Sequence, residues 1–304
     1  MYDIIGDIHG HAEPLKKLLL KLGYQKKGER YCHPERKVLF VGDYIDRGPN
    51  ILETLEIVRG MQESGDAIAL MGNHEYNALC FHFPNQSGGH LRPHSLKNLH
   101  QHYDTLKAFK AEQKLYSDYL EWFKRLSLYY EDDNLRAVHA CWDDHRINFL
   151  KSEGRSEKLS DDFIVQSAQK GNELYTSVDQ TLKGVELKLP DGVFFTDHED
   201  NKRKDVRIKW WENPANFNYR SYSVGPSDSI PEIPVDPDKC NVTGYSSVEK
   251  PVFFGHYWFR GMPQLIKSNV CCVDYSVADG GLLVAYRHDG EQILDQEKFE
   301  YERV

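Results

Sequence analysis

The sequence has 304 residues, of which 40% are hydrophobic and 28% are charged, and its formal net charge is −9. This composition is ordinary for a folded chain with a sizeable core, and no apolar run is long enough to predict a membrane span. The acidic balance and the lack of a long Lys/Arg run argue against a general grip on nucleic acid, although local positive charge would still bind a small anion.

The N-terminal stretch and the cysteines favour a cytoplasmic location. MYDIIGDIHG enters an apolar strand pattern directly, with no basic segment and no cleavable apolar segment before it. The six cysteines form no CxxC pair, so we expect reduced, buried thiols.

The first 80 residues alternate between strand and helix patterns. Strand patterns at 2–8, 37–42 and 67–72 are separated by helix patterns at 12–22 and about 50–64. This β-α-β-α-β order predicts a largely parallel sheet with helices on its faces.

The pattern changes after residue 80. Residues 81–102 are rich in His, Pro, Gly and Asn and predict a loop, and 104–127 has the apolar spacing of one long amphipathic helix. LYYEDDNLRAVHA predicts a hairpin around Asp132-Asp133-Asn134, and a further helix is expected near 161–180.

Strand patterns return near the end of the sequence. They lie at 251–256, 269–274 and 281–294, and the last is expected to be a hairpin with an Asp-Gly turn. We therefore expect a single domain over 1–304. Its core would comprise 1–142 and 250–300, and 143–249 would form an inserted cap that walls the site.

Polar side chains follow the predicted strands where each strand ends. The motifs GDIHG, GDYIDRG, GNHE, AVHA and FFGH supply Asp7, His9, Asp43, Asp46, Arg47, Asn73, His74, Glu75, His139 and His256. In parallel α/β sheets, ligands collect at the carboxyl ends of strands. A mixed nitrogen and oxygen set suits Mn, Fe or Zn better than Ca or Mg, and two such ions about 3.5–4 Å apart form a phosphoester-cleaving arrangement.

Each motif also has a simpler interpretation. A single DxH or GNH at a strand end is more often a turn or a helix cap than a ligand, and short motif matches carry a false-positive risk. The occurrence of all five motifs in one order after strands favours the metal site.

GDIHG, GDYIDRG and GNHE, followed by a His and a Gly-His, resemble the phosphoprotein phosphatase branch of the calcineurin-like metallophosphoesterases. The resemblance covers about 1–80, 135–145 and 250–290. It implies an α/β fold, specifically an α+β sandwich in which a central β-sandwich is flanked by helices with an inserted lobe.

The resemblance also implies two divalent metal ions, with Mn²⁺ preferred and Fe, Zn or Ni as alternatives. The implied metal ligands are Asp7 and His9 for the first ion, Asp43 for both, and Asn73, His139 and His256 for the second. His74 would protonate the leaving oxygen, with Asp46 orienting its ring.

Phosphate binding is implied for Arg47, together with Asn73, because a guanidinium matches two phosphate oxygens. The family leads us to expect a second phosphate-binding arginine, for which Arg207 is the candidate; a surface arginine beside core tryptophans is an equal alternative. Glu75 is either a helix-start carboxylate or a partner of the ligands.

Two departures from the family pattern bear on the branch. His139 is followed by Ala140 rather than by Gly-Gly, which resembles bacterial diadenosine tetraphosphatase and its relatives rather than eukaryotic protein phosphatases. GHYW places Trp258 where nucleases and cyclic-nucleotide phosphodiesterases of the wider family have a second His.

The resulting hypothesis is a dinuclear-metal phosphohydrolase that uses a metal-activated water on dinucleoside polyphosphates or small phosphomonoesters. A serine/threonine or tyrosine phosphoprotein phosphatase and a non-catalytic metal-binding scaffold are the alternatives. The sequence leaves two alternative roles open for a group of aromatic residues and for a group of histidines. Trp210, Trp211, Tyr257 and Trp258 either stack a nucleobase or form core, and His82, His90, His94, His100 and His102 either bind a third metal or are solvated loop residues.

Overall fold

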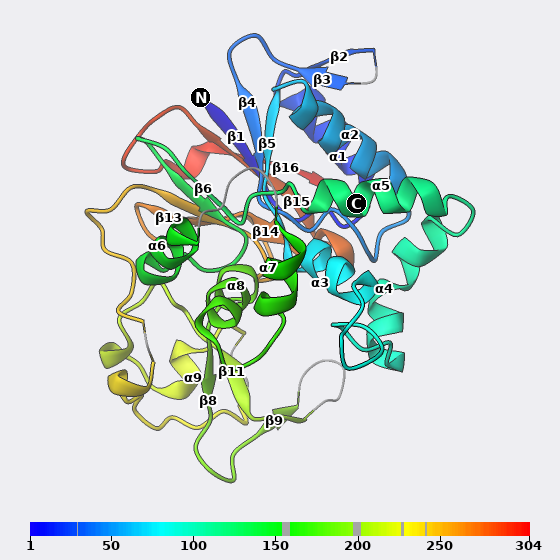
Figure 1. Cartoon of the computed structure of the whole chain (residues 1–304). Coiled ribbons are helices and arrows are strands. Elements are labelled where there is room, and N and C mark those ends of the chain that lie inside the picture. Colours follow the sequence, from blue (N-terminus) through cyan, green and yellow to red (C-terminus); the bar gives the residue numbers. More distant parts are fainter. Residues whose placement is uncertain (29, 154–158, 197–201, 226–227, 241) are drawn as a thin grey trace. The chain divides into compact units, whose positions relative to one another are not determined.

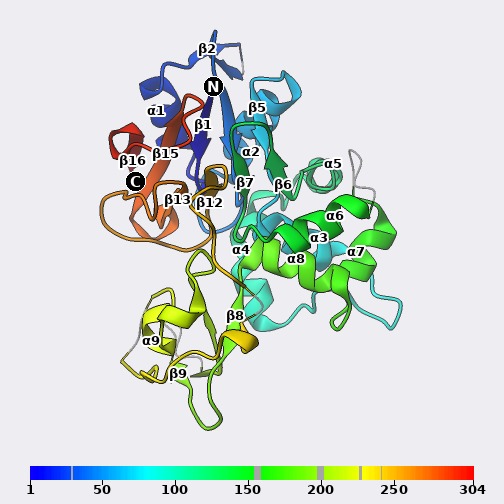
Figure 2. The same ribbon diagram turned by 90° about the vertical axis from the view of Figure 1, so that its left-hand side faces the viewer.

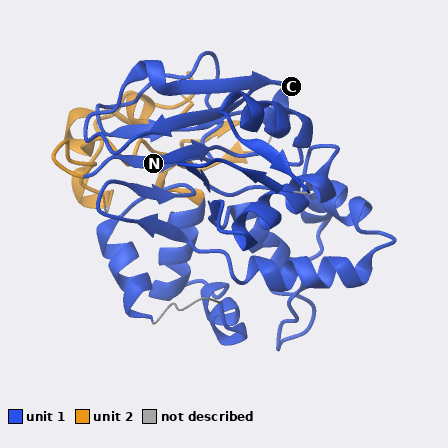
Figure 3. Cartoon of the chain, turned by 90° about the horizontal axis from the view of Figure 1, so that it is seen from above, with its two compact units in different colours: residues 1–182, 250–304 blue, residues 183–249 orange. Residues whose placement is uncertain are grey.

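The computed structural model describes residues 1–28, 30–153, 159–196, 202–225, 228–240 and 242–304. The chain forms two compact units, which Figure 3 shows in blue and orange. Unit 1 comprises Met1–Leu182 and Lys250–Val304, and unit 2 comprises Lys183–Glu249. Residues 143–182 of the expected insertion fold within unit 1, and the role of the insertion as a cap stays a prediction.

The first sheet of unit 1 is parallel on one side of β1 (Tyr2–Ile5) and antiparallel on the other. β1 pairs in parallel with β4 (Lys37–Phe40), which pairs in parallel with β5 (Ala67–Ala69). The antiparallel side contains β15 (Leu282–His288), β14 (Asp274–Tyr275) and β16 (Phe299–Arg303). The predicted parallel arrangement is thus confirmed for the three N-terminal strands.

The second sheet of unit 1 has the order β13 (Val270–Cys272), β12 (Val252–Phe254), β7 (Arg136–Val138) and β6 (Tyr129–Glu131). β12 is parallel to both of its neighbours, whereas β6 and β7 form the predicted hairpin. Asp132 closes that hairpin, because its Oδ1 accepts hydrogen bonds from the backbone N–H groups of Asn134 (2.8 Å) and Leu135 (2.9 Å).

The two sheets pack face to face, as the alternation of side chains along each strand requires. Ile4, Leu39 and Val41 share one buried core with Ala137, Phe253 and Cys271 of the second sheet. Their neighbours in sequence, Ile5, Val38 and Phe40, share the other core with α1 (Ala12–Lys21) and α2 (Ile51–Glu63). Figures 1 and 2 show these helices beside the first sheet. The predicted sandwich with flanking helices is confirmed.

The remaining α-helices of unit 1 correct three predictions. They are α3 (Asn73–His82), α4 (Leu96–Ala108), α5 (Gln113–Phe123), α6 (Asp144–Ser152), α7 (Asp161–Ser167) and α8 (Glu173–Lys183), the last of which crosses into unit 2. The loop predicted over 81–102 is confirmed only for 83–95. α3 runs to His82, and α4 begins at Leu96, where the Ser95 hydroxyl accepts from the backbone N–H of Asn98.

The single helix predicted over 104–127 is also wrong, because the chain breaks after Ala108. The break lets the buried Phe109 ring stack on Tyr116, with centroids 4.4 Å apart. The helix predicted near 161–180 is likewise divided between α7 and α8, and Gly171 between them has φ +95°.

The C-terminal hairpin is longer than predicted. β15 pairs with β16 rather than with residues 291–294, because Leu294 is buried in the core between the sheets. The hairpin of β2 (Gln25–Lys27) and β3 (Arg30–Cys32) was not predicted.

Unit 2 consists of short pieces. β8 (Glu186–Lys188) pairs with β11 (Asp205–Arg207), β9 (Phe195–Thr196) pairs with β10 (Lys202–Arg203), and α9 covers Tyr219–Tyr222. Within the described ranges of the whole chain, no helix has both the length and the apolarity needed to cross a membrane.

Candidate functional site

The predicted ligands of unit 1 lie immediately after strand ends of both sheets. Asp7 and His9 follow β1, Asp43 follows β4, Asn73 begins α3 after β5, His139 follows β7 and His256 follows β12. All of these side chains are buried. The β-sandwich therefore collects carboxylates, imidazoles and one carboxamide at one edge, as the pattern predicted.

Asp43 is the centre of this group. Its Oδ2 atom lies 3.4 Å from Nε2 of His139 and 3.6 Å from Nε2 of His9. Two sets of side chains have the spacing of a metal site, and Asp43 belongs to both: one is His9, Asp43 and His74, and the other is Asp43, His139 and His256.

The hydrogen bonds of the Nδ1 atoms fix the tautomers of His9 and His139. His9 Nδ1–H donates to the carbonyl of Ile45 (2.9 Å) and His139 Nδ1–H donates to the carbonyl of Val41 (2.8 Å). In the neutral rings, Nε2 therefore carries a lone pair directed at the Asp43 carboxylate. His9 Nε2 is buried and has no hydrogen-bond partner in the described part of the chain, so the lone pairs and carboxylate oxygens fit a cation between them.

Burial and charge agree with this geometry. Burial, followed by the nearby positive charge of His74, lowers the pKa of His9 to about 3, which keeps its ring neutral and able to bind a metal. Burial alone would also lower the pKa of His139, but the Asp43 and Asp7 carboxylates outweigh burial and raise it to about 10. The site attracts positive charge, and this nitrogen and oxygen donor set suits a transition metal.

Asp7 is fixed by hydrogen bonds from the segment that follows β12 of the second sheet. The backbone N–H of His256 donates to both Asp7 oxygens, at 3.2 and 3.1 Å. A Cβ on Gly255 would lie 2.0 Å from Asp7 Oδ1, so this position needs glycine. Burial, and next the charges of Asp274 and Asp43, raise the pKa of Asp7 well above its ordinary value, as expected for a carboxylate that is stable only beside a cation.

Glu75 supports the predicted ligands and belongs to neither of the two sets of side chains with metal-site spacing. Its carboxylate accepts from the backbone N–H groups of Gly72 (2.9 Å), Asp43 (2.9 Å) and Tyr44 (2.8 Å). It thereby ties the loop after β4 to the start of α3. A Cβ on Gly72 would lie 2.1 Å from Asp43 Oδ1, so the close approach of the two loops needs the absence of a side chain there.

The backbone of the site is strained. Non-glycine residues with positive φ include His9 (46°), Asp43 (56°), Asp46 (68°), Arg47 (69°), His256 (71°) and Trp258 (55°). Each such residue costs of the order of 1–3 kcal/mol and persists only where its surroundings hold it. Strain concentrated in predicted ligands is typical of a functional site.

His74 and Asp46 form the predicted pair. His74 Nδ1–H donates to Asp46 Oδ2 at 2.5 Å, and His74 Nε2 lies 3.9 Å from Asp43 Oδ2. Burial alone would lower the pKa of His74, but Asp43 and Asp46 raise it overall. The ring therefore presents Nε2 to the ligand cluster, where it is placed either to hold a transferable proton or to bind a metal.

Arg47 and Trp258 lie against each other beside this pair. The Arg47 side chain is exposed, and its Cζ lies 4.0 Å from the centroid of the Trp258 ring. The backbone N–H of Trp258 donates to the buried Asp274 carboxylate (2.7 Å). Trp258 was expected either to stack a nucleobase or to form core, and its contact with Arg47 was not predicted. Asp274 was missed because a single Asp after VCCV carries no motif.

The predicted aromatic platform is mostly core. Trp210 and Trp211 are only 2% and 3% exposed, within unit 2, and Tyr257 is 4% exposed in unit 1, so Trp258, which is half-buried, is the aromatic open to a ligand. Arg207 ends β11 of unit 2, and its phosphate-binding role stays a prediction.

The histidines of 82–102 do not share one role. His90 and His94 stack on each other with ring centroids 4.1 Å apart, and His94 also stacks on Phe81. Within the described ranges, the metal-like groups of side chains are the two that contain Asp43, which leaves no support for a third metal in this segment. His102, expected to be a solvated loop residue, is buried and contacts Asp46 (2.8 Å).

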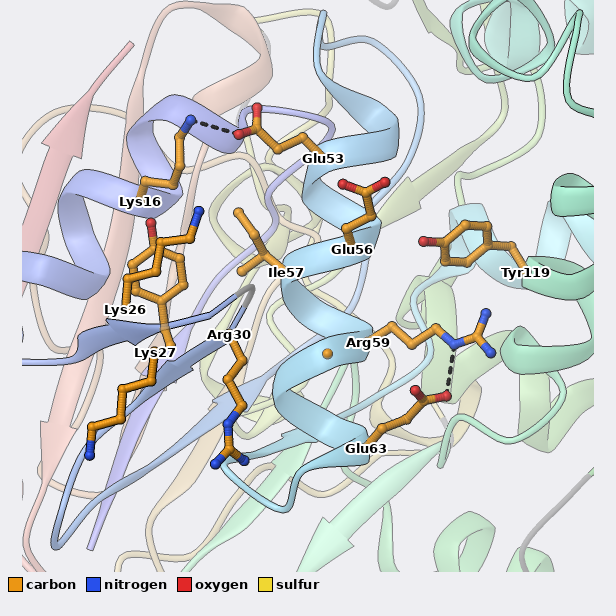
Figure 4. A pocket seen from close by; sticks show the side chains of 12 residues that line it. Lys16, Lys26, Lys27, Arg30, Glu53, Glu56, Ile57, Arg59, Glu63 and Tyr119 are labelled. Atoms are coloured by element: carbon orange, nitrogen blue, oxygen red, sulfur yellow. Dashed lines mark hydrogen bonds and ion pairs between the residues drawn. The ribbon is translucent and has the colours of Figure 1, made fainter.

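A separate cavity of about 600 Å³ lies beside α2 and the β2–β3 hairpin (Figure 4). Five cationic and three acidic side chains line it. Lys16 pairs with Glu53 (2.7 Å) and Arg59 with Glu63 (2.8 Å). None of the predicted site residues lines this cavity.

Comparison with known proteins adds a family and two relatives. The model of the family described as calcineurin-like phosphoesterase matches residues 2–230. The asymmetrical bis(5'-nucleosyl)-tetraphosphatase PrpE of Oceanobacillus iheyensis is 32% identical over 166 residues, which cover 54% of this chain and 62% of that protein. The symmetrical bis(5'-nucleosyl)-tetraphosphatase of Marinomonas sp. is 25% identical over 301 residues, covering 95% of this chain and 94% of that protein.

Among solved structures, a protein serine/threonine phosphatase from Saccharomyces cerevisiae is similar, with a TM-score of 0.50 and 12% identity. The match covers 99% of this chain and 78% of that protein. At this identity, the likeness concerns the fold alone.

Proposed function

Because the chain belongs to the calcineurin-like phosphoesterase family, we propose that it is a dinuclear-metal phosphohydrolase that cleaves phosphoester or phosphoanhydride bonds. One observation carries the proposal: Asp43 Oδ2 lies between the Nε2 atoms of His9 and His139, within the two ligand sets that share Asp43. A bridging carboxylate between two sets of ligands is the arrangement of a two-metal phosphoesterase.

The residues of each proposed metal site follow from their positions. Asp7, His9 and Asp43 would hold the first ion, and Asp43, Asn73, His139 and His256 the second. Asn73 Oδ1 lies 3.1 Å from His139 Nε2, so both face the same point. We favour Mn²⁺ because the donors mix imidazole and oxygen. When bound, the two ions would supply an activated water and Lewis-acid stabilisation of the phosphoryl oxygens.

Arg47 would bind the phosphate, together with Asn73. The residue is exposed and its guanidinium is stacked on Trp258, an arrangement in which the N–H edge would pair with two phosphate oxygens. The phosphate would then be held at the strand ends, with the leaving group open to His74.

His74 would act as the general acid. Asp46 accepts the Nδ1–H of the ring, so the proton to be transferred is on Nε2. As the phosphorus–oxygen bond breaks, that proton would pass to the leaving oxygen, and the ring would become neutral while Asp46 stays ionised. The competing role of His74 as a metal ligand predicts a lower metal content on its replacement, and the general-acid role predicts no change.

For the substrate, we propose dinucleoside polyphosphates or small phosphomonoesters. Support comes from the names of the two bacterial relatives, from His139-Ala140, and from the half-buried Trp258 beside Arg47, which offers a ring face for a nucleobase. The six cysteines are unbridged, which supports a reducing compartment such as the cytoplasm.

Two assays test this function. Hydrolysis of p-nitrophenyl phosphate with and without added Mn²⁺ separates an enzyme from a metal-binding scaffold, because only an enzyme would turn over. Catalytic efficiency on diadenosine tetraphosphate should then exceed that on phosphoserine, phosphothreonine and phosphotyrosine peptides. A tenfold preference for a peptide, about 1.4 kcal/mol of transition-state binding, would reverse the substrate assignment.

A further inference from the structure

Helix α4 presents two buried polar side chains to Asp46. His102 and Thr105 are three residues apart, so they lie on one face of the helix, and they are 5% and 0% exposed. His102 Nδ1–H donates to Asp46 Oδ1 at 2.8 Å, and the Thr105 hydroxyl donates to the same oxygen at 2.5 Å. Asp46 Oδ2 is thereby left to His74.

Thr105 also holds the backbone of Asp46. The Asp46 N–H donates to Thr105 Oγ1 at 3.0 Å, while the Thr105 O–H donates to the Asp46 carboxylate. Asp46 has φ +68°, a conformation that costs an Asp of the order of 1–3 kcal/mol unless neighbours fix it. One hydroxyl therefore fixes both the strained backbone and the side chain of Asp46.

His102 is itself fixed from behind. Its Nε2 lies 2.6 Å from the Tyr116 hydroxyl, and the Tyr116 ring stacks on the buried Phe109. A carboxylate only accepts hydrogen bonds, so the His102 proton lies on Nδ1, and in the neutral ring Nε2 accepts from Tyr116. The result is a chain of hydrogen bonds from Tyr116 through His102 and Asp46 to His74.

We propose that His102 and Thr105 are positioning residues for the general acid, which hold Asp46 Oδ1 so that Oδ2 orients His74 Nε2 toward the leaving oxygen. This inference rests on the proposed function of His74. Without donors on Oδ1, the carboxylate is free to rotate about its Cβ–Cγ bond, and the His74 ring loses its fixed direction. A His74 ring that points in the wrong direction lowers the rate of proton transfer to the leaving oxygen but leaves phosphate binding intact.

Two variants of His102 separate its two nitrogens. His102→Asn retains a donor near the position of Nδ1, facing Asp46. His102→Gln retains an amide group near the position of Nε2, whose oxygen accepts from Tyr116, and removes the donor to Asp46. We expect His102→Gln to lower kcat on phenyl phosphate about tenfold more than on 2,4-dinitrophenyl phosphate, whose leaving group needs little protonation, with KM little changed. His102→Asn should recover most of the loss.

His100→Gln is the matched control, because His100 is exposed on the same helix and should leave both rates as they are. Thr105→Val and Thr105→Ser form a second pair that keeps the volume of the side chain: the valine variant should lose kcat selectively on phenyl phosphate, and the serine variant should recover it. This pair decides the question if His102→Gln does not fold.

Proton NMR of the metal-free protein provides a measurement that does not depend on activity. The His74 Nδ1–H bonded to Asp46 should give a low-field signal that is shifted or lost in His102→Gln and Thr105→Val and retained in His102→Asn. Equal rates and signals in His102→Asn and His102→Gln, or an unchanged leaving-group dependence in Thr105→Val, would overturn the inference. A wild-type protein that hydrolyses no phosphoester would instead refute the proposed function, and the NMR comparison would still decide whether α4 fixes His74.

Discussion

Asp43 and Asp46 lie three residues apart in one loop, both with positive φ and both beside imidazoles, yet their surroundings are opposite. Asp43 Oδ2 faces two Nε2 atoms at 3.4 and 3.6 Å, whose rings direct their Nδ1–H groups elsewhere. Asp46 accepts hydrogen bonds at 2.5–2.8 Å from His74, His102 and Thr105.

The difference shows which groups neutralise the charge of each carboxylate, in the cluster around Asp43 and in the cluster around Asp46. Around Asp43 a carboxylate and two imidazole Nε2 atoms converge, which is unfavourable unless positive charge, a proton or a metal ion, lies between them. Around Asp46 the protein itself supplies every donor, and hydrogen bonds from His102 and His74 keep its pKa below the ordinary value although burial alone would raise it. Contact lengths and tautomers thus distinguish the carboxylate proposed to bind metal, Asp43, from the carboxylate proposed to orient His74, Asp46.

The largest effect is expected from Asp43→Asn. Because this carboxylate belongs to both ligand sets, the variant should lose both metals and at least about 10³-fold in kcat/KM, about 4 kcal/mol of transition-state stabilisation. Elemental analysis and p-nitrophenyl phosphate hydrolysis measure the two losses.

Asp46→Asn is the matched control for metal content. It makes the same chemical change three residues away, and it should keep both metals while losing turnover. Two metals retained in Asp43→Asn would contradict the assignment of Asp43.

His74→Asn should have the next largest effect. Turnover on phenyl phosphate should fall about 10²-fold or more, as is usual for loss of a general acid, while the metal content stays the same. The loss should shrink on 2,4-dinitrophenyl phosphate. A lower metal content in this variant would instead make His74 the ligand that its place beside His9 and Asp43 allows.

The Asp43 cluster was predictable from sequence to a much greater degree than the Asp46 cluster. Its residues sit in short motifs directly after apolar strands, and the period of the strands fixes where those strands end. The family resemblance that these motifs carry is confirmed, and so is the β-sandwich.

The supports of Asp46 were not predictable, because they come from a helix that was itself mispredicted. His102 lies in a segment rich in His, Pro, Gly and Asn that predicted a loop, whereas α4 begins at Leu96. Its burial depends on the break at Phe109, which follows from ring packing against Tyr116 and not from local helix propensity. Thr105 was missed because a single threonine on a helix carries no motif.

The stabilisation of the folded protein by bound metal offers a further test of the difference between Asp43 and Asp46. Free Mn²⁺ at about 100 times the Kd of one site should stabilise the native state by about 2.7 kcal/mol, because the unfolded chain has no preformed ligand set. We expect this gain in wild type and in Asp46→Asn, but not in Asp43→Asn. Urea unfolding with Mn²⁺ or with EDTA measures it. A gain of equal size in Asp43→Asn would show that the metal binds elsewhere.

The smallest effect is expected from replacing Trp258, which contacts both Arg47, the proposed phosphate-binding residue, and His9 of the Asp43 cluster. Its ring lies 4.0 Å from Arg47 Cζ, and the centroids of its ring and the His9 ring are 6.2 Å apart. A cation–π contact at a partly exposed site is worth about 1 kcal/mol, so Trp258→Leu should weaken inhibition by inorganic phosphate about fivefold and raise KM similarly, while metal content stays unchanged. Trp258→Phe should lose less, because a ring remains.

Tyr301→Leu is the control, since it removes the contact of Tyr301 with Lys21 and should leave phosphate inhibition as it is. Unaltered phosphate inhibition in Trp258→Leu would show that Arg47 is positioned without the indole, and that the carboxylates of the site, rather than stacking, hold the guanidinium in place.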